Sequence, residues 1–303
     1  MYDGMLNVYK EKGYTSHDVV ARLRGILHQK KIGHTGTLDP DARGVLPVCL
    51  GKATRLCDMV TDHEKTYEAV LLLGLETDTQ DISGRVLRES RVLAEEEQVR
   101  EIIMGFVGDY AQIPPMYSAL KVNGRKLYEL ARAGKVVERQ PRQVTVRQIV
   151  IESVKLPRVT MTVCCSKGTY IRTLCHDIGQ KLGCGGCMES LIRTRVGRFC
   201  LEDSLTLSQI EELCGQGLLK QKLISVEDMF GQYPRAVVCP AADHLVRNGN
   251  PLRETDVFLE DQGEQPEGCR YYRVCDSSRV FMGIYEWDQD KARLKPWKMF
   301  PGG

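Results

Sequence analysis

The stretch Lys31–Val48, with the sequence KIGHTGTLDPDARGVLPV, restricts the fold more than any other part of the chain. It contains three glycines and two prolines, and no spacing of apolar residues that would bury one face of a helix, so it predicts a loop. Pro40 favours an extended backbone at Asp39, which places this carboxylate in a turn beside His34 and two threonines. A plain surface turn is the alternative, because Asp-Pro and glycine pairs mark turns in many proteins.

Length and charge limit the class of protein. The chain has 303 residues, enough for one large and one small domain or for two medium domains. Its formal net charge is only +2, so a nucleic-acid partner must be sought in the local charge distribution. The first residues lack the pattern of a signal peptide and no apolar run approaches a membrane span, so a cytoplasmic protein without membrane association is expected.

The 12 cysteines are scattered along the chain, which indicates reduced, mostly buried side chains and not a disulfide framework. Cys184 and Cys187 form one Cys-x-x-Cys pair. A zinc site needs four ligands, and a second pair at the usual spacing is missing. We therefore expect no metal ion.

Apolar spacing predicts helices and strands in alternation along residues 4–230. Helices are expected at 16–27, 49–60, 94–106 and 171–182, and strands at 4–14, 67–73, 144–154 and 159–165. Thr206 and Gln209 predict a capping box that begins a further helix. Residues 191–198 look like a short basic stretch before another strand.

A basic segment follows the proline-rich residues 112–121. Between residues 121 and 147 there are eight basic and two acidic residues, a local charge of +6, with Tyr117 and Tyr128 among or beside them. Such a segment is typical of contact with a phosphate backbone. A solvated helix face with salt bridges is the alternative. We favour RNA contact by an insertion at about 112–142.

Composition changes near residue 231. Short strands are expected at 236–239, 257–259, 271–275, 280–286 and 293–298, with one short helix at 241–247. This pattern predicts a small β-barrel-like domain, so the expected domains are residues 1–230 and 231–303.

The loop around Asp39 resembles the catalytic loop of the bacterial TruB-type tRNA pseudouridine synthases, Gly-His-Thr-Gly-x-Leu-Asp-Pro-x-Ala-x-Gly-x-Leu-Pro, at every specified position. The resemblance extends over residues 4–300 and is strong again around residues 165–174. It implies an α+β fold: a pseudouridine synthase catalytic domain with a mixed, largely antiparallel sheet, followed by a small PUA-like RNA-binding β domain.

The resemblance also implies roles for individual residues. Asp39 matches the nucleophile, Arg172 the partner that orients it, and Tyr67 the ring that stacks on uracil and assists proton removal. The remaining matches line the substrate site: His34 takes the place of the extruded base, and Tyr170 and Leu191 line the uracil pocket.

The expected activity is isomerisation of uridine 55 in the tRNA T loop to pseudouridine, without a cofactor, because the reaction is redox-neutral. The sequence leaves open whether Asp39 attacks the base or C1′, or first permits glycal formation. The expected partner is the T-arm stem-loop of tRNA, bound by a monomer that needs no other protein. Two alternatives remain: a guide-RNA-dependent pseudouridine synthase, and a non-catalytic protein that binds or folds tRNA.

Overall fold

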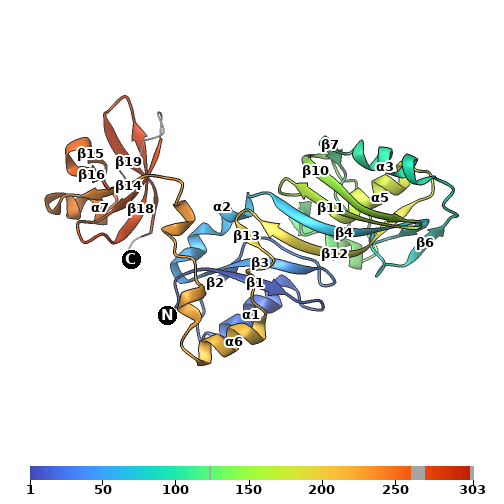
Figure 1. The fold of residues 1–303 in the computed structure, drawn as a ribbon, viewed down its shortest axis with the longest axis horizontal. Helices are drawn as coiled ribbons and strands as arrows, with labels where there is room; N and C mark the ends of the chain where they lie inside the picture. The colour runs from blue at the N-terminus through green and yellow to red at the C-terminus, as the bar shows by residue number, and fades with distance from the viewer. Residues whose placement is uncertain (123, 261–269, 301–303) are drawn as a thin grey trace. The chain divides into compact units, whose positions relative to one another are not determined.

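The computed structural model describes residues 1–122, 124–260 and 270–300. The chain forms two compact units. The large unit comprises Asn7–Val48 and Cys57–Leu218, and the small unit comprises Met1–Leu6, Cys49–Leu56 and Leu219–Gly303. Figure 1 labels the elements of each unit.

The helices and strands follow one another in mixed order. The α-helices are α1 (Ser16–Ile26), α2 (Cys57–Thr61), α3 (Glu96–Met104), α4 (Leu127–Arg132), α5 (Ile171–Lys181), α6 (Leu207–Gly215) and α7 (Asp243–Arg247). The strands up to the basic segment are β1 (Gly4–Lys10), β2 (Ile32–His34), β3 (Arg43–Leu50), β4 (Lys65–Leu73), β5 (Leu75–Thr77), β6 (Val86–Glu89), β7 (Gly108–Gln112), β8 (Lys121–Val122) and β9 (Arg125–Lys126). The later strands are β10 (Arg142–Lys155), β11 (Arg158–Cys165), β12 (Gly186–Val196), β13 (Phe199–Cys200), β14 (Arg235–Val238), β15 (Leu252–Arg253), β16 (Val257–Leu259), β17 (Tyr271–Cys275), β18 (Phe281–Asp288) and β19 (Arg293–Met299).

The main sheet has the strand order β1-β3-β12-β4-β11-β10-β7, with β2 beside β3 and β13 beside β12. Strand β12 pairs parallel with β3 and antiparallel with β4, and β4, β11, β10 and β7 continue antiparallel. The predicted mixed, largely antiparallel sheet is therefore confirmed.

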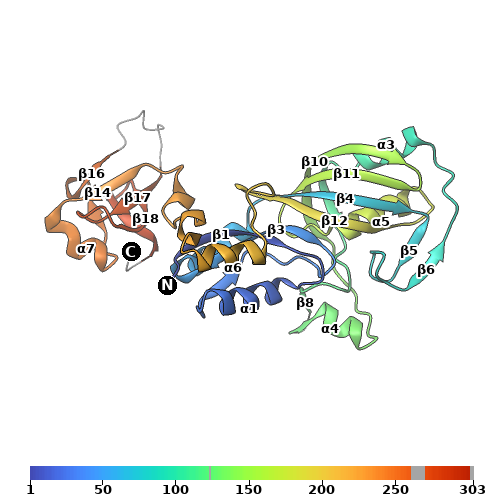
Figure 2. The same cartoon turned by 60° about the horizontal axis from the view of Figure 1, so that its bottom comes forward.

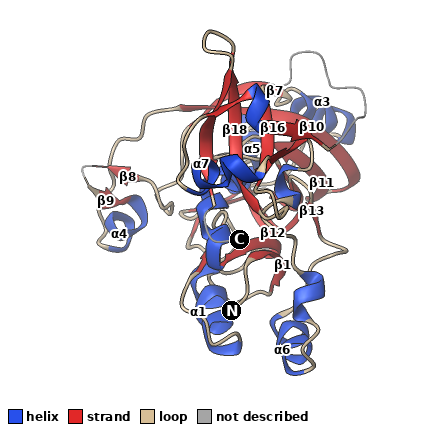
Figure 3. Cartoon of the chain, turned by 90° about the vertical axis from the view of Figure 1, so that its left-hand side faces the viewer, coloured by secondary structure: helices blue, strands red, loops and turns tan. Residues whose placement is uncertain are grey.

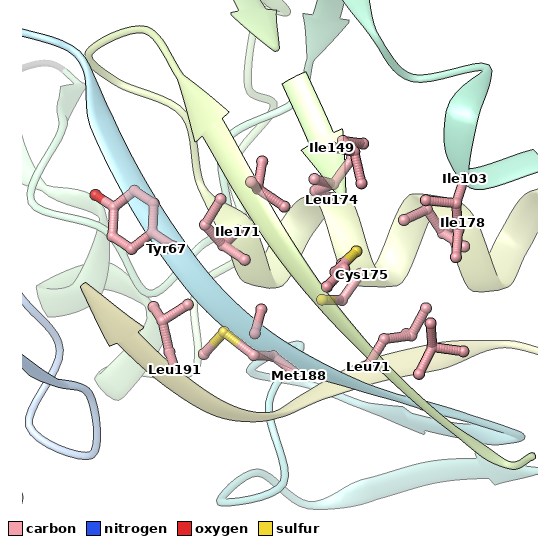
Figure 4. Close-up of a cluster of buried hydrophobic side chains, with 14 of the residues drawn as sticks. Tyr67, Leu71, Ile103, Ile149, Ile171, Leu174, Cys175, Ile178, Met188 and Leu191 are labelled. Carbon is pink, nitrogen blue, oxygen red and sulfur yellow. The ribbon is translucent and has the colours of Figure 1, made fainter. Parts of the chain in front are cut away.

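Helices α3 and α5 cover one face of this sheet and contact each other. The predicted apolar stripe of α5 is confirmed, since Ile171, Leu174, Cys175 and Ile178 are all buried in the core that α5 shares with β4 and β12. Figure 4 shows these side chains directed from the helix toward the strands. This packing fixes the N-terminus of α5 against the sheet.

Three expectations need correction. The loop that starts at Lys31 is shorter than predicted, because β3 begins at Arg43. Residues 49–60 do not form one helix: β3 runs to Leu50, a 3-10 helix follows at Gly51–Leu56, and α2 starts at Cys57. Residues 191–196 belong to β12 itself and are not a stretch before a strand. In each case a buried strand takes residues that looked irregular or helical.

The small unit contains a second sheet, with the order β15-β19-β18-β17-β14-β16. Each predicted strand of this region is present, and α7 lies within the residues predicted to be helical. Its core includes Val238, Val246, Leu252, Val274 and Tyr285. Residues 261–269 and 301–303 of the predicted small domain lie outside the described residues. A small C-terminal β domain is thus confirmed.

The basic segment lies in the large unit. It contains the short β8–β9 hairpin and α4, and both stand away from the main sheet in Figures 2 and 3. Lys126 and Arg132 place their charges over the ring of Tyr128, 5.4 and 5.5 Å from its centroid.

Of the helices formed by described residues, none has both the length and the apolar character to cross a membrane.

Candidate active site

The loop between β2 and β3 is anchored on both sides of Asp39. Leu38 is buried in the core, and its backbone NH donates to Ser16 Oγ at 3.0 Å. Lys10 is fully buried, and its Nζ donates to the carbonyl oxygen of Ala42 at 2.6 Å. Because these anchors come from β1 and α1, the loop presents Asp39 in one fixed position.

Arg172 reaches Asp39 from the first turn of α5. Its Nη2 donates to Asp39 Oδ1 at 3.0 Å and to the carbonyl oxygen of Tyr117 at 2.8 Å, while Nη1 lies 3.7 Å from Asp81 Oδ2. Only 7% of the Arg172 side chain is exposed. A cation is unfavourable in the first turn of a helix, and the two carboxylates offset that cost.

The ionisation of Asp39 is set by two opposing effects. Burial raises the pKa of Asp39, and the Arg172 charge opposes this rise without cancelling it. The side chain retains 38% of its exposure, so the carboxylate is open to an incoming molecule although protein surrounds most of it. An oriented, accessible carboxylate held beside a guanidinium is suited to nucleophilic chemistry.

Tyr67 and Leu191 lie on neighbouring strands at one end of the large core. Both are 9% exposed, and Figure 4 shows the Tyr67 hydroxyl directed away from the labelled apolar side chains. Burial raises the pKa of Tyr67, the Arg193 charge opposes this rise, and the Asp39 charge adds to it. Tyr67 is therefore within electrostatic range of Asp39.

His34 precedes Asp39 in the sequence by five residues, and Tyr170 follows it much later, at the start of α5. The backbone NH of Gly36 donates to His34 Nδ1 at 3.3 Å, and burial lowers the pKa of His34, so its ring is neutral at pH 7. Tyr170 is the N-cap residue of α5, and Gln112 binds both its NH and its carbonyl oxygen, at 2.7 and 3.0 Å. The charges of Asp39 and Arg172 both act on the Tyr170 hydroxyl.

The structure thus joins Asp39 to Arg172, and the charge of Asp39 acts on both Tyr67 and Tyr170. Leu191 lies in the same core cluster as Tyr67, on the neighbouring strand, whereas His34 packs edge-on against His17 at 5.2 Å. Two residues of this site were missed in the sequence: Asp81 and the buried Arg193. Asp81 lies in a polar segment with nothing to distinguish it from other loop carboxylates. Arg193 was one of several arginines in the basic stretch predicted at residues 191–198.

Within residues 1–122, 124–260 and 270–300, no group of three or more His, Cys, Asp or Glu side chains is arranged to hold a metal ion. The cysteines of these residues are present as thiols.

Two family models match most of the sequence. The N-terminal domain of the TruB family pseudouridylate synthases matches residues 24–171, and the tRNA pseudouridylate synthase B C-terminal domain matches residues 172–244. The tRNA pseudouridine synthase B of Lachnoclostridium phytofermentans is 54% identical over 98% of this chain and 99% of that protein. The tRNA pseudouridine synthase B of Alkaliphilus oremlandii is 46% identical over 93% of each chain.

Solved structures agree with the fold. An H/ACA RNP bound to a substrate RNA containing 2′-deoxyuridine contains a chain similar to this one, with a TM-score of 0.71, 24% identity, and coverage of 99% of this chain and 85% of that chain. A Cbf5-Nop10-Gar1 complex gives a TM-score of 0.71 at 25% identity, covering 98% and 85%. The resemblance inferred from the Asp39 loop is therefore confirmed, and the chain is an enzyme that belongs to the TruB family of pseudouridylate synthases.

Proposed function

We propose that the protein converts uridine 55 in the T loop of tRNA into pseudouridine, with Asp39 as the nucleophile. The observation that carries this proposal is the contact of 3.0 Å between Arg172 and Asp39, which orients an accessible carboxylate in a mostly buried site and favours its charged form. Curated relatives that carry the name tRNA pseudouridine synthase B over almost the whole chain support tRNA as the substrate.

The reaction breaks the N1–C1′ bond of uridine, turns the base, and joins C5 to C1′. These atoms are inaccessible in stacked RNA, so the nucleotide must first be extruded into the site. Asp39 then acts as the covalent nucleophile, and Arg172 keeps its carboxylate charged and fixed. No electrons are gained or lost overall, so the proposal includes neither a redox cofactor nor a metal ion.

The walls of the site hold the base. The ring of Tyr67 stacks on the uracil, and its hydroxyl takes part in removal of the C5 proton. Leu191 and Tyr170 enclose the base from β12 and from the start of α5. His34, being neutral, stacks in the space that the extruded nucleotide leaves in the RNA.

The rest of the RNA is held outside this site. We assign residues 1–230 to the catalytic domain and 231–303 to a PUA-like RNA-binding domain, with residues 112–142 as an RNA-contacting insertion. The Arg172 guanidinium binds the carbonyl oxygen of Tyr117, so the same side chain that orients Asp39 also holds the start of the insertion. We expect a cytoplasmic monomer that needs no protein partner.

The test is conversion of a T-arm stem-loop RNA by the wild type and by Asp39→Asn. The amide keeps the shape of the carboxylate but cannot act as the nucleophile, so we expect turnover to fall about 10³-fold or more while RNA affinity is retained. Pseudouridine is mapped in the product RNA. Near-normal turnover by Asp39→Asn would end the assignment of the nucleophile.

A guide-RNA-dependent enzyme is the second candidate, because the solved chains of similar fold belong to an H/ACA RNP and a Cbf5-Nop10-Gar1 complex. Activity on unmodified tRNA with no added RNA or protein favours the stand-alone enzyme. A protein that only binds or folds tRNA would leave uridine 55 unchanged in the same assay.

A further inference from the structure

A second arginine, Arg193, is buried below the Asp39 loop and is not used by the roles proposed above. It is 1% exposed and lies on β12 directly opposite Tyr67 on β4 in the register of the sheet. Two residues earlier on the same strand is Leu191, which lines the proposed uracil site. Arg193 is therefore placed among the residues of the site and not on the surface.

The guanidinium is held in place by backbone. Its Nε donates to the carbonyl oxygen of Val45 at 2.7 Å. Its Nη1 lies 3.8 Å from the position that a Cβ on Gly36 would occupy, so it borders the loop that carries Asp39. Gly44 packs against the backbone of Arg193 so closely that an added Cβ would lie 2.2 Å from its carbonyl oxygen. These contacts hold the Arg193 backbone and its Nε beside the loop that carries Asp39.

The charge of Arg193 is not neutralised by a carboxylate. Its Nη2 is buried, and within the described residues it has no hydrogen-bond partner. The group that favours its charged form against burial is the hydroxyl of Tyr67. An unpaired buried guanidinium is costly, and such groups are retained where a function needs the charge. Arg172 has two carboxylates nearby, whereas Arg193 has a phenol.

Proton removal explains why a cation would be placed there. After C5 has joined C1′, the C5–H bond breaks, its electron pair forms the C5=C6 double bond of the ring, and N1 gains a proton. A neutral phenol already carries its own proton and cannot accept another. Tyr67 must therefore be a phenolate, or become one, when it takes the proton from C5.

We propose that Arg193 is the positioning residue of Tyr67: its guanidinium holds the Tyr67 oxygen in place and stabilises the phenolate that accepts the C5 proton. The enzyme would then have a buried arginine for each of its two reactive oxygen acids, Arg172 for Asp39 and Arg193 for Tyr67. This inference rests on the proposed function of Tyr67.

The electrostatic surroundings agree with this role. Burial raises the pKa of Tyr67, Asp39 and Cys165 raise it further, and the charge of Arg193 lowers it. The charge of Arg193 also lowers the pKa of three other groups, Lys10, Lys65 and His34. Burial lowers the pKa of each of these and that of Arg193 as well, but an arginine starts from the highest ordinary pKa and the Tyr67 hydroxyl opposes the effect at Arg193.

The test uses Arg193→Met, which removes the charge but keeps the length, and Arg193→Lys, which keeps the charge. Single-turnover rates on the T-arm stem-loop are measured across the neutral and alkaline range, together with RNA affinity. For Arg193→Met we expect a rate about 10²-fold lower at neutral pH, with the rise in rate moved to higher pH and RNA affinity unchanged. Arg193→Lys should retain most of the rate at neutral pH and lose it toward alkaline pH, because burial lowers the pKa of a lysine, as it does for Lys10 and Lys65.

Two further measurements separate charge from structure. Arg195→Met removes an exposed arginine from the same strand and should leave the rate constant of the chemical step unchanged. Replacing the tyrosines by fluorotyrosine, a more acidic phenol, should raise the neutral-pH rate of Arg193→Met more than that of the wild type.

The outcomes decide between the two proposals. A uniform loss at every pH in Arg193→Met, without rescue by fluorotyrosine, would show a structural role only. If Arg193→Met does not fold, the test depends on Arg193→Lys and Tyr67→Phe. A folded Arg193→Lys that loses as much of the neutral-pH rate as Tyr67→Phe would refute the proposal that the Arg193 charge stabilises the phenolate. A wild type that makes no pseudouridine would instead refute the proposed function.

Discussion

Removal of Arg172 gives the sharpest test of how the site is kept charged. The substitution Arg172→Met leaves Asp39 near Asp81 with no cation between them and releases the carbonyl oxygen of Tyr117. Burial then raises the pKa of Asp39 without opposition from Arg172. The nucleophile is thereby shifted toward its protonated, inactive form.

The size of the effect follows from the distance and the exposure. Two unit charges 3.0 Å apart interact by about 5.5 kcal/mol at an effective dielectric constant of about 20. The Asp39 side chain is 38% exposed, so solvent screening leaves roughly half of this, about 2 to 3 kcal/mol. Since about 1.4 kcal/mol corresponds to a factor of ten, we expect the protonation equilibrium of Asp39 to move about 30- to 150-fold toward the inactive acid, which lowers the rate wherever that form predominates.

The assay is single-turnover formation of pseudouridine at a series of pH values. Because a higher pKa is overcome by higher pH, the ratio of the Arg172→Met rate to the wild-type rate should rise with pH. Arg158→Met is the matched control, since Arg158 lies 2.8 Å from Glu189 but is 55% exposed, and we expect little change. A loss in Arg172→Met that does not change with pH would refute the electrostatic explanation.

Two predictions concern stability. Gly44 has φ +110° and faces the backbone of Arg193, so Gly44→Ala should lower the free energy of unfolding by about 2 to 3 kcal/mol in urea titrations. Gly215 lies in open space at the end of α6, so Gly215→Ala is the control and should not destabilise the protein. Equal effects of the two substitutions would contradict the predicted steric clash at Gly44. Burial lowers the pKa of Lys65 from 10.5 to about 8, so between these values the unfolded chain binds more protons and rising pH stabilises the wild type. Lys65→Met should lack this gain of about 3 kcal/mol, and parallel stability curves for the two proteins would show that the pKa is not lowered.

Local patterns in the sequence were sufficient for many elements. The apolar spacing of α5 predicted its buried face, and Thr206 and Gln209 form the expected capping box of α6. The strands of the small unit were predicted because turn residues separate short apolar runs. The segment 49–60 failed for a reason that is also local: a short buried strand and a buried helix have similar apolar runs, and periodicity alone does not separate them.

The electrostatic partners in the site could not be predicted in the same way. Arg172 is 133 residues from Asp39 in the sequence, and only the resemblance to a family joined them. Arg193 was predicted only as part of the basic stretch at residues 191–198, and arginines are rarely buried. Its burial depends on the parallel pairing of β12 with β3 and the antiparallel pairing with β4, which are properties of the whole sheet.

The packing of whole elements also explains how the chain can hold charged side chains in its interior. Arg172 comes from the start of α5 and Arg193 from β12, so each guanidinium is fixed by an element that is already packed in the large core. A buried lysine loses its charge more readily, as the pKa values of Lys10 and Lys65, lowered to about 8, illustrate. Burial lowers the pKa of Arg193 too, but from a much higher ordinary value. Residues that must hold an anion away from water are therefore expected to be arginines on regular elements, with the reactive acid left on the loop.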